Sequence, residues 1–539
     1  MKKIDMTEGS IVKKVLLFAL PIVLGNILQY LYTTVDTLVI GNYCDHTALA
    51  GVGTSSQPIE VLLCIFLGIG TGVSILMSQF AGADNRKGIE DASKTAVSIV
   101  YFCGIPISII GYFAAPLLLR IMQVPEDVWG HALIYTRIVL ISATGNIGYN
   151  MNAGILRGIG DSTASLYFLI VSCLANIGLD LLLVAVFHMG VAGVAIATGV
   201  AMFISWIFSI IYIKVRYPNI GFTVLPKGMN AKVLRQILAI GLPIGLNNSL
   251  FSFGHMAMQT LVNEQGSVFM AGWSVSGRVN GLANMAISGI SAAATTFSGQ
   301  NFGAKRIDRL KQGQYLIPFL SGGITLTLGL LFILVRMPVL RMFTKDVQVL
   351  EVAGRQVIVM MSCQWMYAVF SSISNIVNGT GRVKYTTVVN LLMLWAVRIP
   401  AAWLIATLFD GGFIMLAYPA SFGFGMFAML GYYRLCAFWK KLMQTARLTQ
   451  STEEIQNVTE TQNVKEIKNA IEIQNAIEIQ NVKEIQNAIE IQNLKDVQNA
   501  IETQNVKEIQ NAIEKQIAKE VQNIVEVQNA KEVKTAKGA

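Results

Sequence analysis

The chain has 539 residues, of which 53% are hydrophobic and only 14% are charged, whereas soluble domains carry about 25% charged residues. The apolar residues gather in long runs, which excludes an ordinary soluble domain and indicates a membrane protein. The net charge of +9 does not indicate nucleic-acid binding, because the basic residues lie in short segments between apolar runs.

A membrane-spanning helix needs about 20 mainly apolar residues, and this criterion predicts an all-α membrane protein of about twelve transmembrane helices. The first run follows several lysines, as in a signal peptide, but it is too long and lacks a cleavage pattern, so we expect it to be retained. The predicted helices are 14–40, 57–80, 93–118, 132–156, 164–187, 191–213, 235–262, 269–298, 314–336, 352–378, 385–409 and 412–438.

Three short motifs occur twice, at a common offset near 221 residues. Leu20-Pro21-Ile22 returns as Leu242-Pro243-Ile244, and Gln79 with Gly82-Ala83 returns as Gln300 with Gly303-Ala304. The third pair is Arg157-Gly158-Ile159-Gly160 and Asn378-Gly379-Thr380-Gly381. Six helices separate the copies, so the sequence predicts two six-helix lobes in a parallel repeat, with the substrate site between them.

These patterns divide the chain into four parts. We expect an N-terminal lobe over 1–213, a linker over 214–234, a C-terminal lobe over 235–440 and a hexapeptide-repeat tail over 441–539. The tail's isoleucines do not stay on one helical face at a period of six, so it is predicted to be a frayed helix or disordered. Lys and Arg concentrate in alternate loops, which predicts that both termini and the linker are cytoplasmic.

Ionisable side chains at membrane depth are the informative residues, because such groups are costly there and rare without a role. Asp36 lies within the first predicted helix and Asp180 in the middle of the fifth, with Asn176 one turn before it on the same face. Asn150 and Thr198 can approach the same depth. These oxygens suit a buried proton or sodium site in the N-terminal lobe. The alternative is that the aspartates only cap or hydrogen-bond helix ends.

The C-terminal half has no acidic counterpart: Asp36 corresponds to a position near Met258, and Asp180 to one near Ala401. It carries Arg278 and Arg398 instead, which either pair with a carboxylate across the cleft or hold helix packing. Pro21 and Pro243 each remove a helical hydrogen bond at matching places and are candidate hinges.

The sequence lacks the motifs of an enzyme. It has no phosphate-binding G-x-x-x-x-G-K-[ST] and no H-E-x-x-H, its four histidines are far apart, and its six cysteines show no paired spacing. We therefore expect no catalytic residues, no bound cofactor and no metal site, apart from a proton or sodium ion, the latter held by Asp36 and Asp180.

Several of these segments resemble multidrug and toxic compound extrusion (MATE) transporters. They are Thr7-Glu8-Gly9-Ser10-Ile11, Ala19-Leu20-Pro21-Ile22, Val35-Asp36, Gln79-Phe80-Ala81-Gly82-Ala83 and Leu156-Arg157-Gly158-Ile159-Gly160-Asp161. The resemblance covers about residues 5–440. It implies alternating-access export of organic, mostly cationic compounds in exchange for protons or sodium.

By similarity, Asp36, Asn150, Asn176, Asp180 and Thr198 match the N-lobe cation site of the DinF-type branch. The alternative function is a lipid-linked oligosaccharide flippase of the same superfamily, for which Arg137, Arg278 and Arg398 would supply cationic charge. We expect a monomer in the cell membrane, whose partners are small organic substrates and membrane lipid, and not nucleic acid.

Overall fold

The computed structural model describes residues 3–409 and 411–434, and the predicted tail lies outside the described residues. The described part is helical and contains no strand. Its elements are α1 (Ile11–Tyr43), α2 (His46–Gly82), α3 (Arg86–Ile99), η1 (Val100–Gly104), α4 (Ile105–Ile121), α5 (Glu126–Ile141), α6 (Ala143–Ile159), α7 (Thr163–Asp180), η2 (Leu181–Val186), α8 (Gly190–Arg216), η3 (Pro218–Ile220), α9 (Ala231–Asn263), α10 (Ser267–Gly303), α11 (Ile307–Leu334), α12 (Arg336–Leu340), α13 (Val347–Gly379), α14 (Val383–Leu391), η4 (Leu392–Arg398), α15 (Ile399–Leu408), η5 (Gly411–Leu416) and α16 (Ala417–Arg434).

The predicted membrane architecture is confirmed. Ten helical spans of the described residues are long and apolar enough to cross a membrane. The other two predicted passes are α10 and the pair α5 and α6, which only Ser142 separates. Both are rich in Gly, Ser and Asn, so their composition is less apolar than that of the others.

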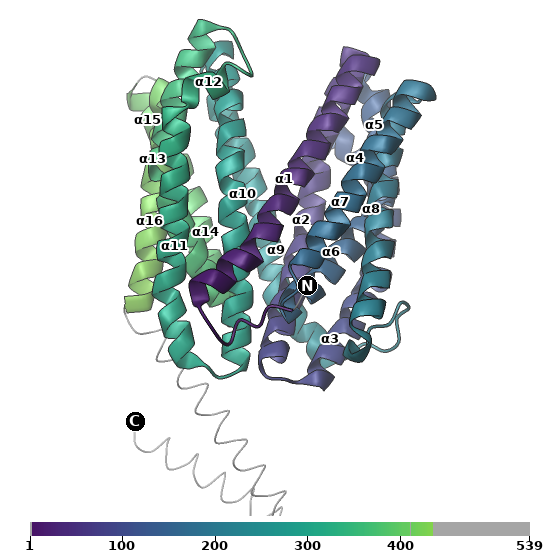
Figure 1. The fold of residues 1–539 in the computed structure, drawn as a ribbon. Coiled ribbons are helices and arrows are strands. Elements are labelled where there is room, and N and C mark those ends of the chain that lie inside the picture. Colours follow the sequence, from purple (N-terminus) through teal and green to yellow (C-terminus); the bar gives the residue numbers. More distant parts are fainter. Residues whose placement is uncertain (1–2, 410, 435–539) are drawn as a thin grey trace, which may run out of the picture. The chain divides into compact units, whose positions relative to one another are not determined.

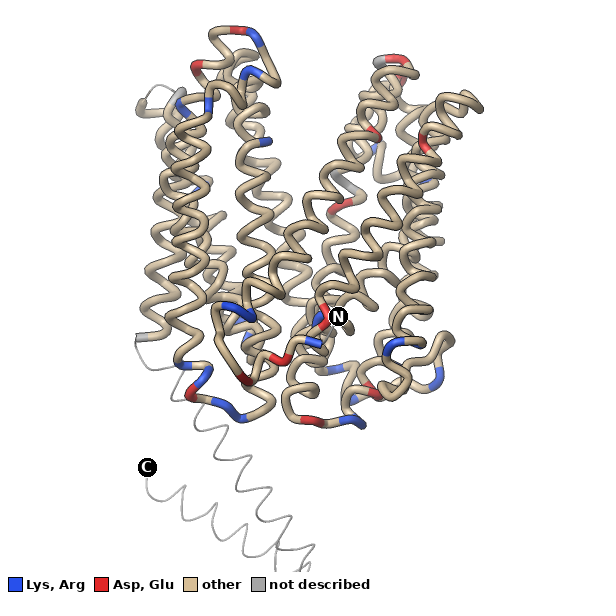
Figure 2. Tube along the Cα trace, viewed as in Figure 1, with Lys and Arg blue, Asp and Glu red and all other residues tan. Residues whose placement is uncertain are grey.

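Polar caps fix several helix starts. Asn85 accepts a hydrogen bond from the Gly88 amide at the start of α3, and Asn230 accepts from two amides at the start of α9. Asp346 does the same for α13. Such caps satisfy amide donors that have no partner inside the helix. Charged residues accordingly gather at the ends of the helices, with few along their middles (Figure 2).

The two lobes meet along small residues. Gly68 and Gly72 of α2 face Gly241 and Gly245 of α9, and a Cβ atom added at Gly72 would lie 2.8 Å from the Ile237 carbonyl oxygen. Glycine permits this close backbone approach, as is common between membrane helices. On the other side α1 packs against α10, where Asn26 donates a 2.7 Å hydrogen bond to Ser288 (Figure 1).

Reciprocal hydrogen bonds join the lobes near the N-terminus. The Gln79 side chain donates to the Gly379 carbonyl at 2.8 Å, and its repeat counterpart Gln300 donates to the Gly158 carbonyl at 3.1 Å. These are the glutamines and glycines of the repeated motifs. The paired contacts therefore obey the symmetry that the sequence predicts, and they hold this end of the lobes together.

The N-terminal segment, residues 4–8, contacts both lobes at the same end. The Ile4 amide donates to the Gly160 carbonyl at 3.0 Å, while the buried Met6 accepts from Asn301 at 3.0 Å and from Arg309 at 3.1 Å. The Met6 amide also donates to Gln300. The segment thus forms a bridge from α6 to α10 and α11.

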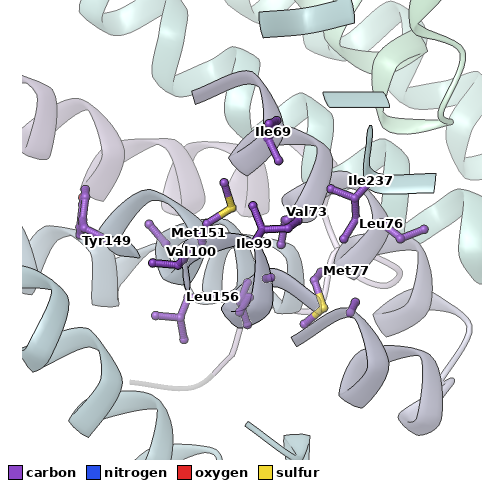
Figure 3. Close-up of a cluster of buried hydrophobic side chains, with 14 of the residues drawn as sticks. Ile69, Val73, Leu76, Met77, Ile99, Val100, Tyr149, Met151, Leu156 and Ile237 are labelled. Carbon is purple, nitrogen blue, oxygen red and sulfur yellow. The ribbon is translucent and has the colours of Figure 1, made fainter. Parts of the chain in front are cut away.

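The largest apolar core described belongs mainly to the N-terminal lobe. It gathers side chains of α2, α3, α6 and α7, including Val73, Met77 and Met151 (Figure 3). Val233 and Ile237 from the first turns of α9 insert into it. The start of the C-terminal lobe is therefore anchored in the core of the other lobe.

Candidate substrate and ion sites

Two large cavities lie within the described part of the helical bundle. One, of about 540 Å³, is lined by N-lobe residues that include Pro21, Glu60, Tyr135 and Asn150. We call it the N-lobe cavity. The other, of about 580 Å³, is lined mostly by α9, α10, α13 and α16 and by Arg398, and we call it the C-lobe cavity. Ile22, Asn26, Thr71 and Arg157 line both, so the cavities adjoin where α1, α2 and α6 come together.

Four of the five predicted ion-site residues come together. Asp36 of α1 interacts with Asp180 and Asn176 of α7 and with Thr198 of α8. Asp180 and Asn176 are almost completely inaccessible, and Asp36 is 9% exposed. Both Asp180 oxygens, one Asp36 oxygen, both Asn176 amide atoms and the Thr198 hydroxyl lack a properly oriented hydrogen-bond partner. None of these unpaired atoms therefore caps or hydrogen-bonds a helix end, which was the alternative role expected from the sequence.

The local helix geometry explains this placement. Asp180 is the last residue of α7 and is followed directly by the π-helical turns of η2. A π-helical segment changes the direction in which successive side chains point, and such segments are frequent at functional sites. Asn176, one α-helical turn earlier, keeps the same face as Asp180.

Asn150 is not brought into contact with Asp36 in this way. Its side-chain amide donates to the carbonyl and the side chain of Asn146, both at 2.9 Å, and it lines the N-lobe cavity. The candidate hinges also differ in their surroundings. Both lie inside helices, Pro21 in α1 and Pro243 in α9, but of the two only Pro21 lines this cavity.

Sequence reasoning missed several side chains of these sites. Tyr135 of α5 lies close enough to Asp36 and Asp180 to interact with their charges, and Tyr32 lies close to Asp36. Arg157, which the charge pattern assigns to a loop, lies in the last turn of α6 and lines both cavities. The sequence signal that could have placed Arg157 in the helix is Gly160, three residues later, which ends α6 in a left-handed conformation.

The two C-lobe arginines occupy different environments. Arg278 is exposed, and its guanidinium lies 6.0 Å from the centre of the Phe343 ring, which agrees with a packing contact. Arg398 is 1% exposed and donates to Ser421 at 3.0 Å. No carboxylate lines the C-lobe cavity among the residues described, so Arg398 is not paired there with an acidic group across the cleft.

A buried carboxylate pair with neutral oxygen donors fits either a proton or sodium. Two carboxylates side by side cannot both stay ionised at low cost, so one of them must bind a proton or share a cation. Carboxylate, amide and hydroxyl oxygens are the ligands of hard cations. The unpaired oxygens of Asp36, Asp180, Asn176 and Thr198 meet both requirements.

The fold and these cavities define a multi-pass membrane transporter. A family model described as MatE matches residues 21–182 and 243–404, and the chain therefore belongs to this family of transporters, the MATE family. The two matched segments are the two halves of the predicted repeat, and membership confirms that the protein is not an enzyme.

Curated relatives cover most of the chain. The probable multidrug resistance protein YoeA of Bacillus subtilis is 28% identical over 82% of this chain and 97% of its own length. The probable multidrug resistance protein NorM of Thermotoga maritima is 25% identical over 75% of this chain and 87% of its own. These comparisons do not favour the flippase alternative.

Solved structures share the fold. A structure described as the outward-facing conformation of a multidrug resistance MATE family transporter aligns with a TM-score of 0.74 and 20% identity. It covers 82% of this chain and 99% of its own. A MATE structure in complex with MaL6 has a TM-score of 0.75 and 21% identity, with 82% of this chain and the whole of that chain covered.

Proposed function

We propose that the protein exports organic, mostly cationic compounds across the cell membrane in exchange for protons or sodium ions. The multidrug resistance names of the relatives support the substrate class. The observation that carries the proposal is the buried pair of Asp36 and Asp180, three of whose four carboxylate oxygens are buried without a hydrogen-bond partner. Such a costly arrangement inside a membrane is expected only where a cation binds and leaves.

The position of α1 supports coupling between the ion and the substrate. The helix carries Asp36, and it also packs against the C-terminal lobe, where a Cβ at Gly289 of α10 would lie 3.1 Å from the Ala19 carbonyl oxygen. Asn26 on the same helix lines both cavities. A cation that ties Asp36 to α7 and α8 would therefore move a wall of the substrate cavities.

Alternating access follows if the cation favours one orientation of α1. The hydrogen bonds of Gln79 and Gln300 close the lobes at the end that carries the N-terminus. We propose that this end is cytoplasmic, as the basic loops indicate, and that the protein works as a monomer in contact with membrane lipid. Cation binding must favour the substrate-releasing state by its differential affinity.

The available energy suffices for export. One charge crossing 100 mV releases about 2.3 kcal/mol, and about 1.4 kcal/mol sustains a tenfold concentration gradient. Exchange of one proton for one monovalent organic cation moves no net charge. In that case only the concentration gradient of the ion drives export.

Ethidium efflux from vesicles, under separately imposed pH and sodium gradients, tests the proposal. Asp36→Asn and Asp180→Asn should each abolish gradient-driven efflux, because Asn keeps the size but neither titrates nor carries charge. Asp45→Asn is the matched control, since Asp45 is exposed just beyond α1 and makes no capping hydrogen bond. Normal pumping by both Asp→Asn variants would refute the proposal, and the gradient that drives the unmodified protein identifies the ion.

A further inference from the structure

Arg398 is a buried cation with no acidic partner among the residues that the structure describes. Its guanidinium lies 4.4 Å from the centre of the Tyr418 ring, 5.1 Å from that of Phe422 and 5.8 Å from that of Phe251. Nε donates to Ser421, but Nη2 is buried and has no hydrogen-bond partner. The aromatic rings hold the guanidinium in position and offset part of its desolvation, yet they leave one donor group free.

The free donor belongs to a residue of the C-lobe cavity wall. The other polar lining groups are amides and hydroxyls, among them Asn280, Asn284, Gln364 and Asn375, together with the imidazole of His255 and a second guanidinium, that of Arg157. No acidic residue lines this cavity in the described part of the chain. A buried charge is stabilised only when it is paired and hydrogen-bonded, so the partner that this cavity lacks is an anion.

The internal repeat relates this cation to a residue of the candidate ion site in the other lobe. The matched family segments begin at residues 21 and 243, and at that offset of 222 residues Arg398 corresponds to Asn176. A π-helical segment lies near each of the two residues: η4 ends at Arg398, and η2 begins after Asp180, one helical turn beyond Asn176. Arg398 therefore occupies in the C-terminal lobe the position that the neutral Asn176, one turn before Asp180, occupies in the N-terminal lobe.

We propose that the C-lobe cavity binds a carboxylate group of the transported compound, with Arg398 as its charged partner. A guanidinium recognises a carboxylate through two parallel hydrogen bonds. The rings of Tyr418, Phe422 and Phe251 would contact the aromatic or apolar body of the same compound. The N-lobe cavity, which Glu60 lines, would take its amine. This inference rests on the proposed export of organic compounds.

Two dyes that differ in this charge and in one ethyl group test the inference. Rhodamine B carries a free carboxylate, and its ethyl ester is the same dye without that negative charge. Binding of each to the purified full-length protein is measured by fluorescence polarisation, without any ion gradient. Arg398→Gln should weaken rhodamine B binding about tenfold or more, the loss of a charged hydrogen bond, and change ester binding far less.

Arg278→Gln is the matched control, because Arg278 is an exposed C-lobe arginine outside the cavity, and it should change neither affinity. Equal weakening of both dyes by Arg398→Gln would show that Arg398 only supports the fold and would overturn the inference. Unchanged binding of rhodamine B would overturn it as well.

A competition on the unmodified protein covers the case in which Arg398→Gln does not fold. Benzoate should displace bound rhodamine B more readily than it displaces the bound ester. Equal displacement of the two dyes would contradict the inference. Displacement of rhodamine B by chloride at the same concentration would indicate a site for inorganic anions and refute a substrate carboxylate site. Ester binding and its gradient-driven efflux test the proposed function separately, because neither requires the carboxylate.

Discussion

The contact between α2 and α9 offers a quantitative test of movement between the lobes. A Cβ atom at Gly241 would lie 2.6 Å from the Ile69 Cα and 2.9 Å from the Gly68 carbonyl oxygen, both of which are backbone atoms. Ordinary van der Waals contact begins at 3.4 Å. Gly241→Ala therefore requires the two helices to separate by about 0.8 Å, and no side-chain rotation can relieve this requirement.

The cost falls on the conformation in which the lobes meet at this interface. Overpacking of this kind costs about 1–3 kcal/mol, which corresponds to about a 5- to 150-fold smaller population of that conformation. The better helix propensity of alanine applies to α9 in both conformations, so it does not offset the shift. Gly241→Ala should thus favour a protein that opens at the end carrying the N-terminus.

Cysteine labelling measures this shift. Ala292, which lines the C-lobe cavity, is replaced by cysteine in a background without the six native cysteines. A membrane-impermeant maleimide should then label the Gly241→Ala protein faster from the side that carries the N-terminus and more slowly from the opposite side. Gly277→Ala in α10 is the control, because nothing lies within 4 Å of its added Cβ. Equal labelling rates for Gly241→Ala and the parent protein would refute the reasoning.

Four further outcomes are expected. The Asp161 carboxylate accepts hydrogen bonds from the Ala164 amide at the start of α7 and from the hydroxyls of Tyr212 and Tyr217. Asp161→Ala removes all three, so the free energy of unfolding in detergent should fall by about 2–4 kcal/mol. Tyr217→Phe removes one of them, and the free energy should fall by less. Burial acts to raise the pKa of Asp5, but the hydrogen bonds from Thr7 and the charges of Lys14 and Lys3 together hold this pKa below its usual range. The ionised form therefore stabilises the N-terminal segment at neutral pH. The hydrogen-exchange protection of that segment, relative to intrinsic rates, should fall as the pH drops below the usual range of a carboxyl pKa, with no such loss in Asp5→Asn. Cysteines placed in 214–234 should react only from the cytoplasmic side, and labelling only from outside would overturn the topology. Removal of 451–539 should leave efflux intact, so lost efflux with normal membrane insertion would contradict this expectation.

The sequence predicts the architecture well because the membrane imposes it. Long apolar runs and the doubled motifs indicate the helices and the repeat, and Gln79 and Gln300 then make equivalent hydrogen bonds in the structure. Helix ends are less accurate: α1 runs over Ile11–Tyr43, beyond both limits of the predicted 14–40. Hydropathy marks the membrane core, whereas a helix continues for as long as its amides find partners.

The candidate ion site could be predicted because a buried aspartate is conspicuous in an apolar run. Asp36 and Asp180 lie together in the structure, but Asn150 lies beside Asn146, because residue type and depth do not determine which way a side chain turns. The surroundings of Arg398 depend on three aromatic rings from two other helices, and no local pattern in the sequence reports such a cluster.

The N-terminal segment has a consequence for biosynthesis. Met6 leaves the ribosome almost first, yet its partners Gln300 and Asn301 lie 294 and 295 residues later in the chain. Membrane proteins are made from the N-terminus onwards, so residues 4–8 must wait until α10 and the start of α11 have been inserted. Their docking is therefore among the last steps of assembly, and it can be completed only by a chain whose second half has been placed correctly beside the first.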